Sequence, residues 1–146
     1  MQITSSTFTN NQKIPTKYTC DGEGINPPLQ FLDIPENTIS LALICDDLDA
    51  PSGSFVHWLN FNISPKTNGN GENDTLNEAI QGITSLGRPG YVGPCPPSGT
   101  HRYIFSLYAL DTKLEIERNT DKSQLEQAMN DHIIEKKELT GLYSKT

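Results

Sequence analysis

The sequence predicts a mainly β fold, a β-rich sandwich with one or two covering helices. Three segments have the apolar patterns of strands, whereas only one has a convincing helical pattern. The chain also holds 10 prolines and 11 glycines, 21 residues together, which favours many short strands and turns over a helical bundle. At 146 residues the chain is long enough to bury a core, so we expect one domain over residues 1–146.

The strongest strand signals lie in the middle and second half of the chain. Ile39–Cys45 is almost continuously apolar, as in a strand covered on both faces. Phe55–Ile63 and His101–Leu110 alternate, so the odd-numbered side chains of each segment are expected to share one face. Weaker strand signals cover Gln2–Ser5, Lys17–Thr19, Leu29–Leu32 and Gly141–Ser144.

One helix is expected after Asp121, which can cap its first turn with Gln124 as the capping-box partner. An apolar stripe at helical spacing then runs as far as Ile133. A shorter helix is expected over Leu76–Ile80. The polar segment 67–74, rich in asparagine and glycine, is expected to be a mobile surface loop.

Charge and composition exclude several classes of function. The formal net charge is −7 and the sequence pI is about 4.8, so the field of the whole protein repels nucleic acids and anionic bilayers. No apolar run approaches the roughly 20 residues of a membrane span. The N-terminus has neither the basic nor the apolar stretch of a signal peptide. We therefore expect a cytoplasmic protein without a nucleic-acid partner and without stable membrane insertion.

The three cysteines, Cys20, Cys45 and Cys95, are odd in number and widely spaced, and none forms a C-x-x-C pair. This pattern predicts neither a zinc site nor a disulfide framework. Cys45 lies in an apolar strand and is expected in the core. Cys95 is interpreted as a small packed residue. The alternative is a thiol that His101 activates for hydrolysis.

Three predicted strands place a polar side chain near one end of an apolar face. Asp47 continues the alternation of Ile39–Cys45, and His57 and His101 belong to the other two strands. Each residue alone is commonly a core residue. Two imidazoles and a carboxylate beside loops rich in proline and glycine are, however, typical of a preformed pocket.

The chemistry of these three side chains favours a small anion. Imidazoles donate hydrogen bonds to a phosphate or carboxylate, and Asp47 can fix their tautomers or pair with an ammonium group of the ligand. Two histidines and an aspartate are also the donor set of a facial-triad metal site. The spacing of Asp47, His57 and His101 does not match a recognised ligand spacing, which ranks the metal enzyme lower.

Four motifs along nearly the whole chain carry a resemblance to a known family. They read CDGEGINPPL at 20–29, DLDAPSGSFVHW at 47–58, GYVGPCPPSGTHRY at 90–103 and ELTGLY at 138–143. Together they resemble the phosphatidylethanolamine-binding protein family, in its short prokaryotic Raf-kinase-inhibitor-like branch. The resemblance implies a β-sandwich with a large central antiparallel sheet, a smaller second sheet and peripheral helices. It also implies a ligand pocket lined by Asp47, Phe55, His57, Gly93, Pro96, Pro97, His101 and Tyr103.

The residues and the resemblance together predict a non-enzymatic binding protein that needs no cofactor or metal. Its expected ligand is a small anionic or zwitterionic molecule with a phosphate or carboxylate group. One alternative is an inhibitor that blocks a serine protease or a kinase with its loops. The other is a hydrolase or a metal enzyme. The resemblance also implies a homodimer.

Overall fold

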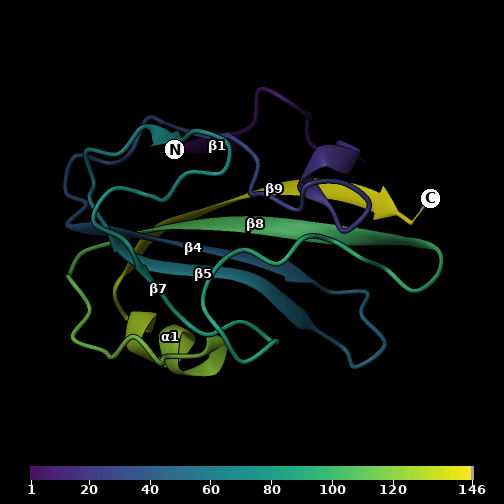
Figure 1. Ribbon diagram of the computed structural model, residues 1–146. Helices are drawn as coiled ribbons and strands as arrows, with labels where there is room; N and C mark the ends of the chain where they lie inside the picture. The colour runs from purple at the N-terminus through teal and green to yellow at the C-terminus, as the bar shows by residue number, and fades with distance from the viewer. Residues whose placement is uncertain (146) are drawn as a thin grey trace.

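The computed structural model describes residues 1–145, which form two β-sheets and one α-helix (Figure 1). The strands of the larger sheet follow the order β2-β9-β8-β4-β5-β7, and those of the smaller sheet the order β1-β3-β6. The predicted mainly β fold with two sheets is confirmed. The elements are β1 (Gln2–Thr4), β2 (Gln12–Lys13), a 3₁₀ helix (Thr16–Tyr18), β3 (Leu29–Leu32), β4 (Ser40–Asp47), β5 (Phe55–Ile63), β6 (Gly69–Asn70), β7 (Ile80–Gln81), β8 (Thr100–Leu110), α1 (Lys122–Met129) and β9 (Ile133–Ser144).

The larger sheet separates two apolar layers. In Figure 1, β4, β5, β8 and β9 form the central sheet, with the smaller sheet on one side and α1 on the other. Phe31 of the smaller sheet packs in one cluster with Leu43 and Phe105 of the larger sheet. On the opposite face, Ile44 belongs to a second cluster with Leu125 of α1. All pairings in the larger sheet are antiparallel except the parallel edge pair of β2 and β9.

A β-bulge at His57 interrupts the predicted alternation of β5. Val56–Trp58 lies opposite Cys45–Asp46 of β4, so β5 has one residue more than its partner. The extra residue is His57, and such a residue commonly sits beside a functional site because a bulge re-aims its side chain. Beyond the bulge, Leu59 and Phe61 pack into the cluster that contains α1. The prediction that all odd-numbered residues of β5 share one face is therefore wrong.

The polar segment 67–74 is anchored, contrary to the expected mobile loop. It contains β6, which pairs with β3. A Cβ atom on Gly69 would lie 1.9 Å from the carbonyl oxygen of Leu29, and the φ of Gly69 is +135°. Glycine alone allows this close approach. The packing depends on backbone contact, which a reading of side-chain polarity misses.

Two other short predictions are also wrong. No helix covers Leu76–Ile80. Ile80, the last residue of the predicted helix, is the first residue of β7. The predicted strand Lys17–Thr19 is a 3₁₀ helix, Thr16–Tyr18, followed by extended backbone. Both segments are too short for periodicity to separate strand from helix.

The capping box of α1 is confirmed, although the helix is shorter than its apolar stripe predicts. The Asp121 carboxylate accepts a hydrogen bond from the Gln124 backbone, and the Gln124 side chain accepts one from the Asp121 backbone. The helix ends at Met129. Asp131 then adopts a φ of 68°, in the left-handed region, and the chain turns into β9 at Ile133.

Replacing Asp121 with alanine is expected to lower the free energy of unfolding by about 1 kcal/mol, because the first turn of α1 loses its side-chain acceptor. Urea denaturation measures this loss. Asp121→Asn keeps an acceptor oxygen and serves as the matched control. An equal loss in both variants would argue against a capping role.

Candidate functional site

All eight predicted site residues line one cavity of about 460 Å³. The topology explains why. Since β4 is antiparallel to both β5 and β8, its last residue lies beside the first residues of those two strands. Asp47 is thereby in register with Phe55 on one side and Tyr103 on the other. The loop between β7 and β8 completes the wall with Gly93, Pro96 and Pro97.

Asp47 and His101 form a buried pair in the wall of the cavity. The Nδ1 atom of His101 lies 2.6 Å from Oδ2 of Asp47, and the two residues are only 7% and 4% exposed. The other oxygen, Oδ1, accepts a hydrogen bond of 2.8 Å from the backbone N–H of Asp49. Because a carboxylate only accepts, Nδ1 of His101 carries a proton and donates a hydrogen bond to Asp47.

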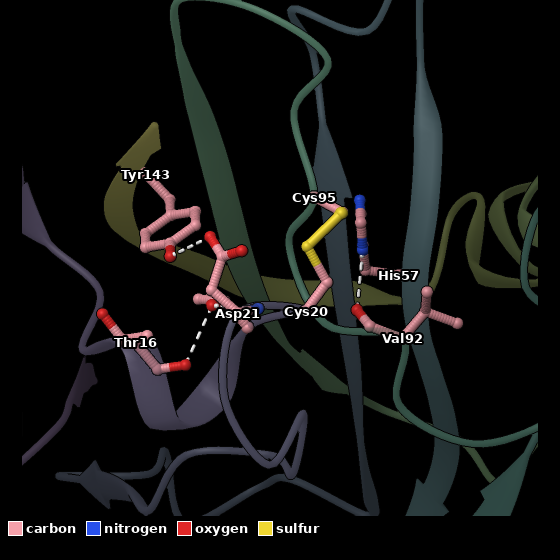
Figure 2. The surroundings of a disulfide bond; sticks show 8 residues. Thr16, Cys20, Asp21, His57, Val92, Cys95 and Tyr143 are labelled. Carbon is pink, nitrogen blue, oxygen red and sulfur yellow. Dashed lines mark hydrogen bonds between the residues drawn. A yellow bond between two sulfur atoms is a disulfide. The ribbon is translucent and has the colours of Figure 1, made fainter. Parts of the chain in front are cut away.

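His57 has its Nδ1 atom fixed in the same way by a backbone acceptor. This atom lies 2.7 Å from the carbonyl oxygen of Val92, and the Val92 N–H donates in return to the His57 carbonyl at 2.8 Å (Figure 2). A carbonyl oxygen only accepts, so Nδ1 of His57 is protonated. Burial lowers the pKa of His57 below its ordinary value, partly opposed by this hydrogen bond. The neutral ring is therefore favoured near pH 7.

Neutral His57 is expected to make stability pH-dependent. The unfolded chain protonates His57 near its ordinary pKa of 6.5, whereas the folded protein resists protonation to lower pH. This contribution to stability is present above pH 6.5 and is lost as the pH falls toward the folded pKa. Urea denaturation at several pH values from 7 to 5 gives the free energy of unfolding as a function of pH. This free energy should fall more steeply in wild type than in His57→Gln, by at most about 1.4 kcal/mol per pH unit.

The exposed His132, which pairs with Asp111, provides the control for this experiment. His132→Gln removes an imidazole far from the bulge and should keep the steep slope of the wild type. Equal slopes in wild type and His57→Gln would show that His57 does not resist protonation in the folded protein.

The ring of Tyr103 packs near both imidazoles. Its ring centroid is 5.2 Å from that of His57, edge to face, and 6.4 Å from that of His101, nearly parallel. Its hydroxyl is buried and has no hydrogen-bond partner among residues 1–145. Burial, reinforced by the nearby Asp47 carboxylate, raises the pKa of Tyr103. The hydroxyl therefore stays protonated near pH 7.

The two fixed tautomers decide what the cavity can bind. Both rings line the cavity, and neither Nε2 atom has a hydrogen-bond partner among the described residues. In a neutral ring whose Nδ1 is protonated, Nε2 is an acceptor; in an imidazolium it is a charged donor. The imidazoles thus donate a hydrogen bond to an anion only from a ring that carries a proton on Nε2 as well, or they accept one from a ligand that brings a proton of its own.

An ion pair beside the cavity holds the loop after β4 against the start of β8. The Asp49 carboxylate accepts hydrogen bonds from Nε and Nη2 of Arg102 at 2.9 and 2.8 Å, and from its backbone N–H at 2.9 Å. The bonds from Arg102 lower the pKa of Asp49 to about 2. Arg102 therefore has a structural role, because it joins the loop after β4 to the start of β8.

Part of the cavity rim was not predicted from the sequence. Leu86 and Arg88, from the loop between β7 and β8, also line the cavity, and both are exposed. Arg88 makes no ion pair or side-chain hydrogen bond within residues 1–145, so its guanidinium is available to a ligand. No motif or alternation marks these residues, because an irregular loop brings them to the site.

The prediction that the cysteines form no disulfide is wrong. Cys20 and Cys95 are joined by an S–S bond of 2.07 Å, although they lie 75 residues apart in the sequence. Cys95 therefore has no thiol in this structure to serve as the nucleophile of the alternative hydrolase. Cys45 is free and buried, as expected.

Among residues 1–145, no three His, Cys, Asp or Glu residues are grouped so that they could hold a metal ion. In the same part of the chain, no helix has both the length and the apolar character needed to cross a membrane.

The chain belongs to the phosphatidylethanolamine-binding protein family. The family model described as "Phosphatidylethanolamine-binding protein" matches residues 4–144, which include every residue of the cavity described above. The resemblance carried by the four sequence motifs is thereby confirmed.

Relatives match the chain over almost its full length. A UPF0098 protein of Methanothermobacter thermautotrophicus is 45% identical over 150 residues, 99% of each chain. Another, of Chlamydia pneumoniae, is 45% identical over 151 residues and is covered completely. A crystal structure of a phosphatidylethanolamine-binding protein homologue from Chlamydia trachomatis has a TM-score of 0.96 and 43% identity, with 99% of this chain and 97% of that one covered. E. coli YbcL, described as a member of the mammalian family, has a TM-score of 0.92 and 27% identity, with 99% and 98% covered.

Proposed function

We propose that this protein is a non-enzymatic binding protein whose cavity holds a small molecule through a phosphate or carboxylate group. His57 and His101 would bind the anion with Nε2–H donors when their rings are protonated on both nitrogens, and Asp47 would orient the His101 ring through Nδ1. The observation that carries the proposal is that the Nδ1 atoms of both imidazoles are hydrogen-bonded to protein acceptors, which leaves both Nε2 atoms for a ligand.

The remaining walls suggest the shape of the ligand. Phe55, Leu86 and the prolines provide apolar surface, whereas Arg88 adds a positive charge at the rim. A ligand with one anionic end and a short apolar body would satisfy both. The family is named for phosphatidylethanolamine, whose headgroup combines a phosphate with an ammonium. In this cavity the phosphate would meet the imidazoles and the ammonium would meet Asp47.

Calorimetric titration of inorganic phosphate and O-phosphoethanolamine at pH 6 tests the proposal. We expect saturable binding of both compounds, and tighter binding of O-phosphoethanolamine if its ammonium contacts Asp47. Acetate tests whether a carboxylate suffices. The absence of heat from all three compounds at millimolar concentration, with the protein folded, would refute the anion pocket.

A further inference from the structure

The Cys20–Cys95 disulfide forms part of the cavity wall. Both cysteines line the cavity and both are exposed. Figure 2 places His57 and Val92 in the surroundings of the bond. A disulfide that serves only to stabilise a fold is usually buried in it, whereas exposed disulfides are the ones open to attack by thiols. The imidazoles and the disulfide thus share one small space.

The two loops that the disulfide joins are also held together by other contacts. The backbone N–H of Cys20 donates to the Pro94 carbonyl at 3.1 Å, and the Tyr91 hydroxyl donates to the Tyr18 carbonyl at 2.9 Å. A Cβ atom on Gly93 would lie only 3.1 Å from the backbone of Thr19, so the loops touch. We therefore expect the cavity to keep its shape when the S–S bond opens.

We propose that this disulfide undergoes thiol–disulfide exchange with small thiols that carry a carboxylate or phosphate group. The inference rests on the proposed function, because the imidazoles that bind an anion would hold the attacking molecule. The thiolate sulfur of the ligand forms a bond with Sγ of one cysteine while the Cys20–Cys95 bond breaks. The bonding electron pair stays on Sγ of the other cysteine, which becomes a thiolate and takes a proton from an imidazolium or from water. No oxidant or reductant besides the ligand thiol is needed.

The negative charge of the protein makes a preference for anionic thiols over neutral thiols a specific sign of a local binding site. The protein carries a net charge of −7, so its overall field disfavours anionic thiols relative to neutral ones. Only a local site reverses that order. Arg88 supplies a positive charge at the rim, and His57 and His101 would add to it inside the cavity when the anionic end binds their protonated rings. Binding the anionic end then raises the concentration of the thiol beside the disulfide.

The test compares 3-mercaptopropionate with 2-mercaptoethanol at pH 6.5. The rate of disulfide opening is followed by acid quench, alkylation and mass spectrometry, which also detects the mixed disulfide. Each rate is divided by the rate of the same thiol with a small unstructured disulfide, which removes the difference in thiol reactivity. We expect a normalised preference for 3-mercaptopropionate of at least tenfold. Saturating inorganic phosphate and His101→Ala should each reduce it to near one.

Competition by phosphate keeps the test valid if His101→Ala does not fold, since it uses the wild-type protein. A preference of one or less, in a protein that binds phosphate in the calorimeter, would overturn this inference and leave the proposed function standing. A preference unaffected by phosphate would also overturn it, because the anionic end would then bind elsewhere. Failure of phosphate to bind at all would remove the proposed function and this inference with it.

Discussion

Replacing His101 with alanine is expected to weaken binding of inorganic phosphate at pH 6 by tenfold or more. The variant loses a charged hydrogen-bond donor, and such a bond contributes about 1.5–3 kcal/mol, or roughly a tenfold to hundredfold change in affinity. It also leaves the buried Asp47 carboxylate without its imidazole partner, which adds negative charge where the anion binds. Calorimetric titration of wild type and variant measures the loss.

Two further variants complete the experiment. His57→Ala is expected to cause a loss of similar size, since it removes the second donor. His132→Ala is the matched control, because His132 also pairs with an aspartate through Nδ1 but lies outside the cavity. Unchanged phosphate affinity in folded His101→Ala and His57→Ala would contradict the assignment of the imidazoles.

Loss of the Cys20–Cys95 disulfide is expected to have the largest effect on stability. The bond joins two cysteines that are 75 residues apart in the sequence. A cross-link over such a long segment restricts the unfolded chain and lowers its conformational entropy. The double substitution Cys20→Ser, Cys95→Ser should lower the free energy of unfolding by about 2–4 kcal/mol. Urea denaturation under non-reducing conditions measures the difference.

Reduction of the wild type provides an independent check. Dithiothreitol should bring wild type close to the double variant and leave the double variant itself unchanged, because Cys45 is buried and free in both proteins. A loss of less than about 1 kcal/mol in both experiments would mean that other contacts between the two loops carry the stabilisation.

The sequence was sufficient to predict the strands that build the site. Asp47, His57 and His101 lie at the ends of long segments with strong apolar patterns, and the antiparallel order of β4, β5 and β8 brings those ends together. The prolines and Gly93 of the loop before β8 were predicted from the resemblance of its motif to the family. These features depend on periodicity and on local motifs, both of which a single sequence displays.

Other features depend on contacts that no pattern displays. The partner of His57 is the carbonyl of Val92, a backbone atom that every residue type offers. The bulge at His57 follows from the pairing of two strands, not from the sequence of either one. The Cys20–Cys95 bond was not predicted, because an odd number of widely spaced cysteines does not indicate a pairing. Since disulfides persist mainly in oxidising compartments, this bond counts against the expected cytoplasmic location.

The pH dependence of anion affinity in the wild type tests most directly whether protonated imidazoles bind the anion. Sulfate is the suitable probe, because it remains a dianion from pH 5.5 to 8. Because both Nδ1 atoms are committed to protein acceptors, an imidazole that donates to sulfate must also carry a proton at Nε2. Burial lowers the pKa of His57 and favours its neutral ring in the free protein, so binding through His57 requires proton uptake. We predict that sulfate affinity falls steadily as the pH rises, approaching tenfold per unit for each proton taken up. Calorimetry in two buffers of different ionisation enthalpy should detect this uptake. Constant affinity across the range, with no proton uptake, would contradict the account.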